Sequence, residues 1–536
     1  MIDGFNGFSS SKKKKFKKFT KQMKSLKSFV FILLFRVANS LLVQTQFNPD
    51  EFWQGPEIAH KMVFGYGYET WEWKERIRGY AHPSIYAAAF WVLKWIRLDT
   101  PWIVMYTPKF IHAILAAIAD RQFYVFAERH VGPAVAKWTS FCGFANWFVF
   151  YTITRSYSNS VEAVLTICAL SVWPSKSDES SFTALCLAAL ATVVRPSSAS
   201  FWIAPCSIIL VRAYINAENF SRHIQNTVIV SIVSISFMFA IDSVYYYDQF
   251  TFVPLNFLRF NVLTGGSEFY GAHPWYWYVC VLCAHSKYKK TTQNINTKKQ
   301  IIDRYFVEGI PSIVGTMLPF LLWGIYTLHC QGSRKLLEWL ICALVPIVLL
   351  SRVAHKELRF ILPQQYIFLT ICGVGLTNLR LRFTNRLWFR VAFVLVIASN
   401  VIAAFYLCLV HQRGAIDVMA KLRQETEIDS VLFLGNCHMT PFHSYLHRAD
   451  VHMRILECPP PLRGESMETY TWEAREFLKS PRDFKIDLSK YSHIVTEDRH
   501  AEVMSDVIER AGHVEFSRVF HSHIEEPYHY VLYKRL

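Results

Sequence analysis

Apolar stretches separated by short polar connections occupy most of the chain between residues 29 and 411. A helix that crosses a bilayer needs about 20 mainly apolar residues, and several of these stretches are short or carry a charge. We therefore predict a mainly α, polytopic membrane protein with about 11 to 13 transmembrane helices. The candidate spans centre on residues 29–44, 84–97, 102–119, 133–153, 160–173, 182–196, 199–213, 226–242, 308–328, 337–351, 361–377 and 391–411.

The composition agrees with a chain that lies in lipid. Hydrophobic residues make up 52% of the sequence, and only 18% of its residues are charged, against about a quarter in soluble proteins. Aromatic residues reach 16%. Such rings favour membrane interfaces, and they also stack on sugars.

The first 27 residues hold nine lysines and a single acidic residue, Asp3. A nucleic-acid-binding arm is one interpretation of such a run. A Lys-rich segment before an apolar stretch is, however, the ordinary signal of a cytoplasmic end. We predict that residues 1–28 are cytoplasmic and that 29–44 is a retained signal anchor. The expected partners are membrane lipids, with no nucleic acid.

Charge also orients the far end of the chain. Four arginines form a basic connection that is expected to face the cytoplasm: Arg380, Arg382, Arg386 and Arg390. The connection before it, 352–360, and the tail after the last span, 412–536, then lie on the lumenal side. The cytoplasmic start places residues 45–83 on that side as well. Three polar regions far apart in the sequence are thus predicted to share one face of the membrane.

The tail at 412–536 has a different pattern from the rest of the chain. It contains a helical segment at 467–479 and three strand-like segments, 430–435, 493–498 and 529–535. We predict a small C-terminal α/β lumenal domain that follows a transmembrane catalytic domain at 29–411.

Most of the 12 cysteines lie inside apolar stretches, where a thiol behaves as a small hydrophobe. Cys280 and Cys283 form an isolated CxxC, without a second pair at metal-binding spacing. We therefore predict no metal site. Cys437 and Cys458 lie in the polar tail, and they can form a disulfide if that tail is lumenal.

The segment at 46–83 contains the first candidate site. Pro49 precedes two adjacent carboxylates, Asp50 and Glu51, at the mouth of a helix. Sugar transfer from a phosphate carrier needs a base for the acceptor hydroxyl and cations for the departing phosphate. Either carboxylate suits the first role, although both also suit a simple helix cap. The other candidates in this segment are Arg76 and Arg78 for phosphate, and Trp53, Gln54, Trp71 and Trp73 for substrate.

The loop at 351–363 contains a second candidate site between two apolar stretches. Its titratable residues are His355, Lys356, Glu357 and Arg359. Charged residues at the edge of a membrane cavity are functional candidates, and Lys356 and Arg359 suit a lipid phosphate. The alternative is a salt-bridged loop that closes two helices.

Three further charges lie at or inside apolar stretches: Arg155, Glu162 and Arg195. Their cost in lipid implies either a polar cavity that binds substrate or an internal ion pair, and both interpretations stay open. The aromatic segment at 245–278, which includes His273, is predicted to lie along the membrane surface. There it either packs against the bundle or lines the acceptor groove.

Several long, charged motifs occur in the same order as in a known family. They are NPDEFWQ with TWEWKER, TRSYSNSVE, RPSSASFW, PLNFLRFN, YGAHPWYW and HKELRFILP, and they cover roughly residues 45–375. The chain resembles glycosyltransferase family 22, within the GT-C superfamily of polytopic enzymes that use dolichol-phosphate-linked sugars. The resemblance implies a base in the first lumenal loop, with Asp50 preferred over Glu51, and a donor phosphate near His355, Lys356 and Glu357. It also implies an inverting transfer without nucleotide sugar, metal or other cofactor.

The segment at 435–462 resembles the lumenal tail of family members that act on the glycosylphosphatidylinositol (GPI) anchor precursor. It implies that dolichol-phosphate-mannose donates the third mannose, in α1,2 linkage, to a GPI-glycolipid acceptor in the endoplasmic reticulum. The chain departs from the family pattern by an insertion near 279–304, to which we assign no function. The resemblance identifies no protein partner.

Two other functions remain as hypotheses. A sister enzyme of the family would elongate the dolichol-linked oligosaccharide for N-glycosylation, and the tail segment distinguishes the two. A transporter or scaffold would use intramembrane charges such as Arg155 and Arg195 as a translocation path. Against the transporter, the polar residues gather on one side of the membrane and no inverted repeat is evident.

Overall fold

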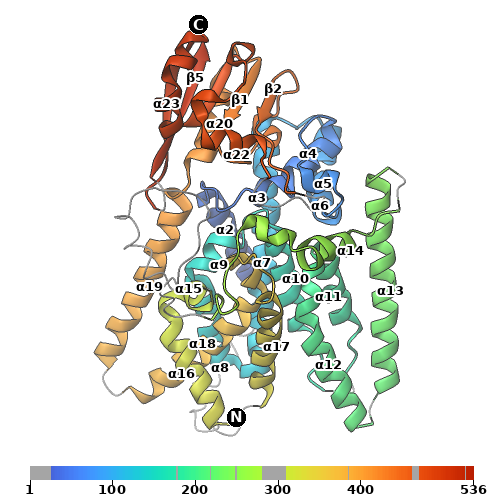
Figure 1. Ribbon diagram of the computed structural model, residues 1–536. Coiled ribbons are helices and arrows are strands. Elements are labelled where there is room, and N and C mark those ends of the chain that lie inside the picture. Colours follow the sequence, from blue (N-terminus) through green and yellow to red (C-terminus); the bar gives the residue numbers. More distant parts are fainter. Residues whose placement is uncertain are drawn as a thin grey trace.

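A bundle of long helices forms one end of the molecule, and a small sheet domain covers the other end (Figure 1). The computed structural model describes residues 26–176, 179–217, 219–247, 250–279, 309–332, 334–383, 386–461, 470–524 and 527–536. The bundle contains α2 (Leu26–Leu42), α7 (Pro101–Val131), α8 (Pro133–Ala145), α9 (Trp147–Thr152), α10 (Ser158–Ser171), α11 (Phe182–Val194), α12 (Ala199–Ile215), α13 (Phe220–Tyr245), α15 (Ile310–Val314), α16 (Leu318–Cys330), α17 (Arg334–Leu350), α18 (Leu362–Arg382) and α19 (Arg386–Leu409).

Among the described residues, six helical stretches are long and apolar enough to cross a membrane. They are Pro101–Val131, Pro196–Ile215, Phe220–Tyr245, Ile310–Cys330, Leu358–Arg382 and Leu387–Gln424. The predicted spans at 29–44, 160–173, 182–196 and 337–351 correspond to helices of 13 to 17 residues in the same bundle. The prediction of a mainly α, polytopic chain is confirmed.

Helix α18 lies at the centre of the bundle and is almost wholly buried. A Cβ atom at Gly375 would lie 2.0 Å from the carbonyl oxygen of Phe320 on α16, and one at Gly373 would lie 2.2 Å from Oγ1 of Thr139 on α8. Small residues at helix crossings are the usual means of close packing in membranes. The separation of these three helices therefore depends on the two glycines of α18.

The predicted span at 133–153 is two helices, α8 and α9, because Asn146 interrupts it. The Asn146 side chain accepts a hydrogen bond from the backbone N–H of Val149 at 2.9 Å and so caps α9. Its amide group also donates to the carbonyl oxygen of Ile313 at 2.9 Å. A polar side chain thus starts a new helix inside an apolar stretch.

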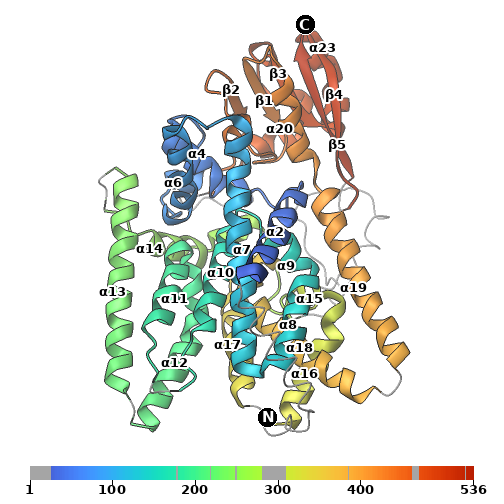
Figure 2. The same ribbon diagram turned by 180° about the vertical axis from the view of Figure 1, so that it is seen from behind.

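Helix α6 (Ala81–Trp95) corrects the predicted span at 84–97. It lies beside α4 (Pro56–Phe64), between the bundle and the sheet domain, and outside the row of bundle helices (Figures 1 and 2). One face packs Tyr86, Ala87 and Phe90 against neighbours from α4 and α7. The other face exposes Trp91 and Trp95, as is typical of a helix along a membrane surface.

The described residues of the sheet domain form five strands: β1 (Ser430–Leu434), β2 (His452–Ile455), β3 (His493–Glu497), β4 (His513–Ser522) and β5 (Tyr528–Arg535). Their order is β2-β1-β3-β5-β4. Strand β1 is parallel to β2 and β3, whereas β5 is antiparallel to β3 and β4. The helices of this domain are α20 (Gly414–Gln424), α21 (His443–Leu446), α22 (Glu473–Lys479) and α23 (Asp498–Arg510).

The three strand-like segments predicted from the sequence are β1, β3 and β5. Strands β2 and β4 did not stand out in the sequence because they lie at the two edges of the sheet and carry many polar residues. Of the helix predicted at 467–479, the described part is α22, and residues 462–469 lie outside the described residues. The predicted insertion near 279–304 lies outside them as well, apart from residue 279.

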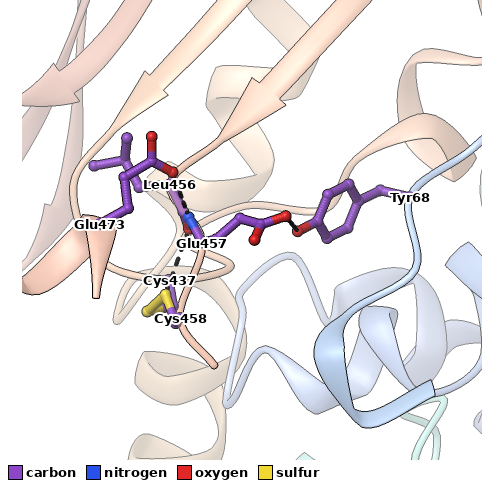
Figure 3. Close-up of a disulfide and its surroundings, with 6 residues drawn as sticks. All are labelled: Tyr68, Cys437, Leu456, Glu457, Cys458 and Glu473. Atoms are coloured by element: carbon purple, nitrogen blue, oxygen red, sulfur yellow. Dashed lines mark hydrogen bonds between the residues drawn. A yellow bond between two sulfur atoms is a disulfide. The ribbon is translucent and has the colours of Figure 1, made fainter. Parts of the chain in front are cut away.

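A disulfide joins Cys437 to Cys458 in the sheet domain (Figure 3). The pairing considered for a lumenal tail is therefore present. The two cysteines are 21 residues apart in the sequence, and Cys458 follows the edge strand β2, which ends at Ile455. The crosslink restrains the segment that leads from the sheet toward the first loop.

Replacing Cys437 and Cys458 by serine is expected to lower the stability of the sheet domain by about 3 kcal/mol, because a crosslink over a loop of this length restricts the unfolded chain. Thermal unfolding of the purified protein, with and without reductant, measures the effect. The serine variant is expected to unfold at the temperature of the reduced wild type. Unfolding that is insensitive both to reductant and to the substitutions would contradict the prediction.

Candidate active site

Four polar segments meet at the end of the bundle that carries the sheet domain (Figures 1 and 2). Their ranges are 46–83, 153–160, 245–278 and 351–361, and hydrogen bonds join them to one another. The first of these segments forms the short helices α3 (Asp50–Trp53), α4 and α5 (Trp71–Lys74) before α6 begins. The regions predicted to share one face of the membrane are therefore brought together.

Helix α3 begins at the first candidate carboxylate, Asp50. The Asn48 side chain accepts a hydrogen bond from the backbone N–H of Asp50 at 2.9 Å, a local turn that Asn favours. The Asn48 amide also donates to Oε2 of Glu357 at 3.3 Å. The Asn-Pro-Asp sequence thus both starts the helix and ties it to the loop at 351–361.

Asp50 forms an ion pair with Arg359, which is 309 residues away in the sequence. Nη2 of Arg359 donates to Oδ2 of Asp50 at 2.5 Å, and the same guanidinium donates to both carboxylate oxygens of Glu357 at 2.5 and 2.8 Å. His355 extends this chain of charged groups, because its Nε2 lies 2.8 Å from Oε1 of Glu357. Among the described residues, Oδ1 of Asp50 accepts no hydrogen bond. The two candidate sites predicted separately are therefore one network.

The charges in this network stabilise one another. Burial by itself would raise the pKa of the Glu357 carboxyl, yet Arg359 and His355 hold it well below its usual range. The Arg359 guanidinium is compensated in turn, because it forms ion pairs with both Glu357 and Asp50. Glu357 is therefore ionised and fixes Arg359, which in turn orients Asp50.

Glu51 lies on a different face of α3 and has a different environment. Its Oε2 accepts a hydrogen bond from Nη1 of Arg155 at 2.7 Å. The Arg155 side chain is fully buried and donates as well to the carbonyl oxygens of Tyr151 and Thr45 and to the Thr45 hydroxyl. The Glu51 side chain is 6% exposed, against 28% for Asp50. Of the two adjacent carboxylates, Asp50 is the one that a substrate can reach.

A pocket near this network has arginines in its wall. Its cavity volume is about 40 Å³. Arg78 and Arg195 line it, together with Gln54, Trp73, His82 and Ser158. Within the described part of the chain, Nε of Arg78 is buried without a hydrogen-bond partner, and a buried donor of this kind is costly unless a ligand satisfies it. The pocket therefore suits an anionic, hydroxyl-rich group.

The two arginines of the pocket are held by carboxylates. Arg78 pairs with Glu72 at 2.5 Å, and Tyr270 donates a hydrogen bond to the same carboxylate at 3.3 Å. Burial would lower the pKa of Arg78, but Glu72 and Asp50 keep it above its ordinary value. Arg195 lies 3.3 Å from Glu162, so two of the three charges predicted to be costly in lipid form an internal pair at the pocket wall.

Other residues predicted to bind phosphate or substrate have structural contacts instead. The Lys356 ammonium donates to the carbonyl oxygens of Val353, Ala354 and His273, at 2.6, 3.5 and 3.0 Å. Since an ammonium group has three donors, these contacts occupy all of them. Lys356 therefore fastens the loop at 351–361 to the segment that contains His273.

The other predicted residues of the first loop have contacts of three kinds: with the pocket, with the sheet domain and with the aromatic segment at 245–278. Gln54 and Trp73 line the pocket, whereas Nε1 of Trp53 donates to the carbonyl oxygen of Thr440 in the sheet domain at 3.0 Å. Trp71 packs against Phe260 and Tyr270 of the aromatic segment. The Arg76 guanidinium lies over the ring of Tyr246 and does not line the pocket.

Glu57 was not singled out in the sequence, although it attaches the sheet domain to the first loop. Its carboxylate accepts hydrogen bonds from the backbone N–H groups of Phe442 and Ser444 and from the Ser444 hydroxyl, at 2.8, 3.0 and 2.6 Å. Burial raises the pKa of Glu57 to about 7, against these hydrogen bonds. An acidic residue at the start of a helix looks like an ordinary cap, so its long-range role left no local signal.

The described residues contain no group of three or more His, Cys, Asp or Glu side chains that is arranged to hold a metal ion. The site instead combines one accessible carboxylate with several guanidinium groups. Such a set can take a proton from a hydroxyl and stabilise an anionic leaving group.

Comparison with solved structures identifies the fold. The chain superimposes on ArnT from Cupriavidus metallidurans, whose crystal structure contains undecaprenyl phosphate, with a TM-score of 0.55 and 12% sequence identity. The match covers 95% of this chain and 97% of that one. The chain thus has the fold of the GT-C glycosyltransferases.

Comparison of sequences identifies the family. The model of the Alg9-like mannosyltransferase family matches residues 27–285 and 303–447. GPI alpha-1,2-mannosyltransferase 3 of Danio rerio is 35% identical over 93% of this chain and 87% of its own length. The protein of the same name from Homo sapiens is 33% identical over 93% and 85%, and GPI mannosyltransferase 3 of Yarrowia lipolytica is 33% identical over 85% and 82%. The chain belongs to the Alg9-like mannosyltransferase family, and it is a multi-pass membrane mannosyltransferase.

Proposed function

We propose that the chain is the α1,2-mannosyltransferase that adds the third mannose to the GPI-anchor precursor, with dolichol-phosphate-mannose as donor. Relatives named for this activity match 93% of the chain, including the tail. The geometric observation that carries the proposal is the accessible Asp50 carboxylate, which Arg359 holds close to the arginine-lined pocket.

In the proposed reaction, Oδ1 of Asp50 accepts the proton of the acceptor 2-hydroxyl. The hydroxyl oxygen forms a bond to C1 of the donor mannose, and the bond from C1 to the phosphate oxygen breaks with inversion at C1. Dolichyl phosphate leaves with the bonding electrons, and Asp50 later releases its proton to solvent. A positioned base contributes about 10²- to 10⁴-fold to such a step.

Arg78 and Arg195 are the proposed ligands of the donor phosphate. Both line one pocket, and guanidinium groups match the geometry of phosphate oxygens. The buried Nε of Arg78 supplies a donor that points to no other described group. Negative charge that develops on the departing phosphate is stabilised by donors fixed in advance.

We place this end of the molecule in the lumen of the endoplasmic reticulum. Disulfides persist in oxidising compartments, and the Cys437–Cys458 disulfide lies in the sheet domain above the site. Arg380 and Arg382 end α18, about 30 Å from its start beside the site. Basic residues mark the cytoplasmic side, which agrees with a lumenal site and a cytoplasmic N-terminus.

Deletion of the gene tests the acceptor. Cells that lack the protein are expected to accumulate a GPI precursor with two mannoses, as seen in a profile of radiolabelled mannolipids, and the wild-type gene is expected to restore the normal profile. A normal GPI profile together with truncated dolichol-linked oligosaccharides would contradict the proposed acceptor. In that outcome the chain would be the sister enzyme that elongates the N-glycan precursor.

A further inference from the structure

A second pocket lies between the first loop and the sheet domain. Its cavity volume is about 590 Å³. Its wall is formed by Tyr68 of the first loop and by residues of the sheet domain, among them Arg454, Glu457, Tyr470, Trp472 and Glu473. Figure 3 shows the Tyr68 ring pointing from the loop toward Glu457. Pockets of this size hold ligands of several hundred daltons.

The polar groups of this second pocket form balanced pairs. The Tyr68 hydroxyl donates to Oε1 of Glu457 at 3.1 Å, and Lys74 lies 3.4 Å from the same oxygen. Glu473 accepts hydrogen bonds from Arg454 at 2.5 Å and from the backbone N–H of Glu457 at 2.9 Å. Donors and acceptors therefore alternate without a large excess of either charge. Such a lining suits an uncharged ligand with many hydroxyl groups.

Aromatic rings connect the second pocket to the catalytic network. The ring of Tyr270 lies 5.6 Å from that of His355 and 5.3 Å from that of Phe269. Phe269 in turn lies 5.0 Å from Trp472 of the sheet domain, and Trp472 lies 6.0 Å from Tyr470. His355 is joined to Asp50 through Glu357 and Arg359. A continuous series of rings thus runs from His355, at one end of the charged network, to the second pocket.

We propose that this second pocket binds the sugars of the acceptor glycan that lie away from the reacting hydroxyl. Large, rigid aromatic side chains provide much contact area at a low cost in conformational entropy, and the polar pairs beside them match sugar hydroxyls. Binding of these remote sugars holds the acceptor equally well in the ground state and in the transition state, which lowers its KM and leaves kcat unchanged. This inference rests on the proposed function, since it takes an oligosaccharide as the acceptor.

Trp472→Ala in the full-length protein tests the pocket by steady-state kinetics with a synthetic GPI precursor that bears two mannoses. The KM for the acceptor is expected to rise about tenfold, the effect of removing a central aromatic contact. The kcat and the KM for dolichol-phosphate-mannose are expected to stay within about twofold, since neither depends on that contact. Trp472→Leu, which keeps an apolar side chain against Phe269 without the flat ring, is expected to give the same change. Trp91→Ala, an exposed tryptophan on α6, is the matched control without effect.

Two outcomes would overturn the inference. An unchanged acceptor KM in both Trp472 variants would exclude the pocket from acceptor binding. A fall in kcat without a rise in acceptor KM would assign Trp472 to support of the fold or of the catalytic network. If the wild type extends another lipid-linked glycan instead of the GPI precursor, the proposed function fails, and the same kinetic comparison with that glycan then tests the pocket.

Discussion

Replacing Asp50 by asparagine is expected to lower the kcat for mannose transfer by about 10³-fold, the usual contribution of a general base. Asparagine has almost the same size as aspartate, and its carbonyl oxygen still accepts a hydrogen bond from Arg359 at the position of Oδ2. It cannot take a proton from the acceptor hydroxyl, however. The purified variant is therefore expected to bind both substrates with nearly normal KM values. Single-turnover transfer from dolichol-phosphate-mannose measures the loss directly.

Asp417→Asn is the matched control for this experiment. Asp417 pairs with Arg413 at 2.9 Å, and its exposed fraction of 33% is close to the 28% of Asp50. It lies in α20, so the substitution removes a comparable ion pair away from the catalytic network. Transfer is expected to stay within about twofold of the wild type, as for most surface changes. Retention of activity by Asp50→Asn within tenfold of the wild type would show that another group accepts the proton.

Replacing Glu51 by alanine is expected to destabilise the folded protein by about 3 to 5 kcal/mol, because removal of one member of a buried ion pair leaves the other charge uncompensated. Arg155 is fully buried, and no other carboxylate among the described residues pairs with it. The expected result is a lower yield of folded protein and a much lower unfolding temperature in detergent. Thermal unfolding of the purified variant measures the change.

Glu51→Gln separates the two roles that a carboxylate can have at this position. Glutamine keeps an oxygen that accepts a hydrogen bond from Arg155, so its effect on stability is expected to be less than half that of alanine. The folded fraction of the Glu51→Gln variant is expected to transfer mannose with a kcat within about tenfold of the wild type, since Asp50 is intact. A stable Glu51→Gln variant without activity would reverse the assignment and make Glu51 the base.

Much of the candidate active site was predictable because lipid excludes polar groups. The loops that contain Asp50 and Arg359 carry charges at the ends of apolar stretches, and such charges must lie at a membrane surface or in a polar cavity. The lysines at the start and the arginines at the junction of α18 and α19 then predict that both loops lie on one side. This reasoning needs only local composition, and the structure joins Asp50 to Arg359 directly.

Some residues with the right chemistry have other roles because their neighbours come from distant segments. Lys356 resembles a phosphate ligand in the sequence, but its ammonium is occupied by backbone carbonyl oxygens, one of them from His273. Trp53 lies three residues from Asp50, yet its ring packs against the sheet domain. Neither contact has a counterpart in sequence spacing, since the partners are 83 and 387 residues away.

The sequence by itself determined the polytopic helical class, the side on which the polar loops gather and the family to which the chain belongs. These features follow from hydrophobic length, from charge at helix ends and from long motifs, all of which are local. Only the tertiary structure shows that Asp50 is accessible and Glu51 is buried. Successive residues on a helix point about 100° apart, and the position of Arg155 buries one carboxylate while Arg359 holds the other at the accessible face. The packing of four separate loops decides which side of α3 faces the protein interior. No local sequence pattern encodes that packing.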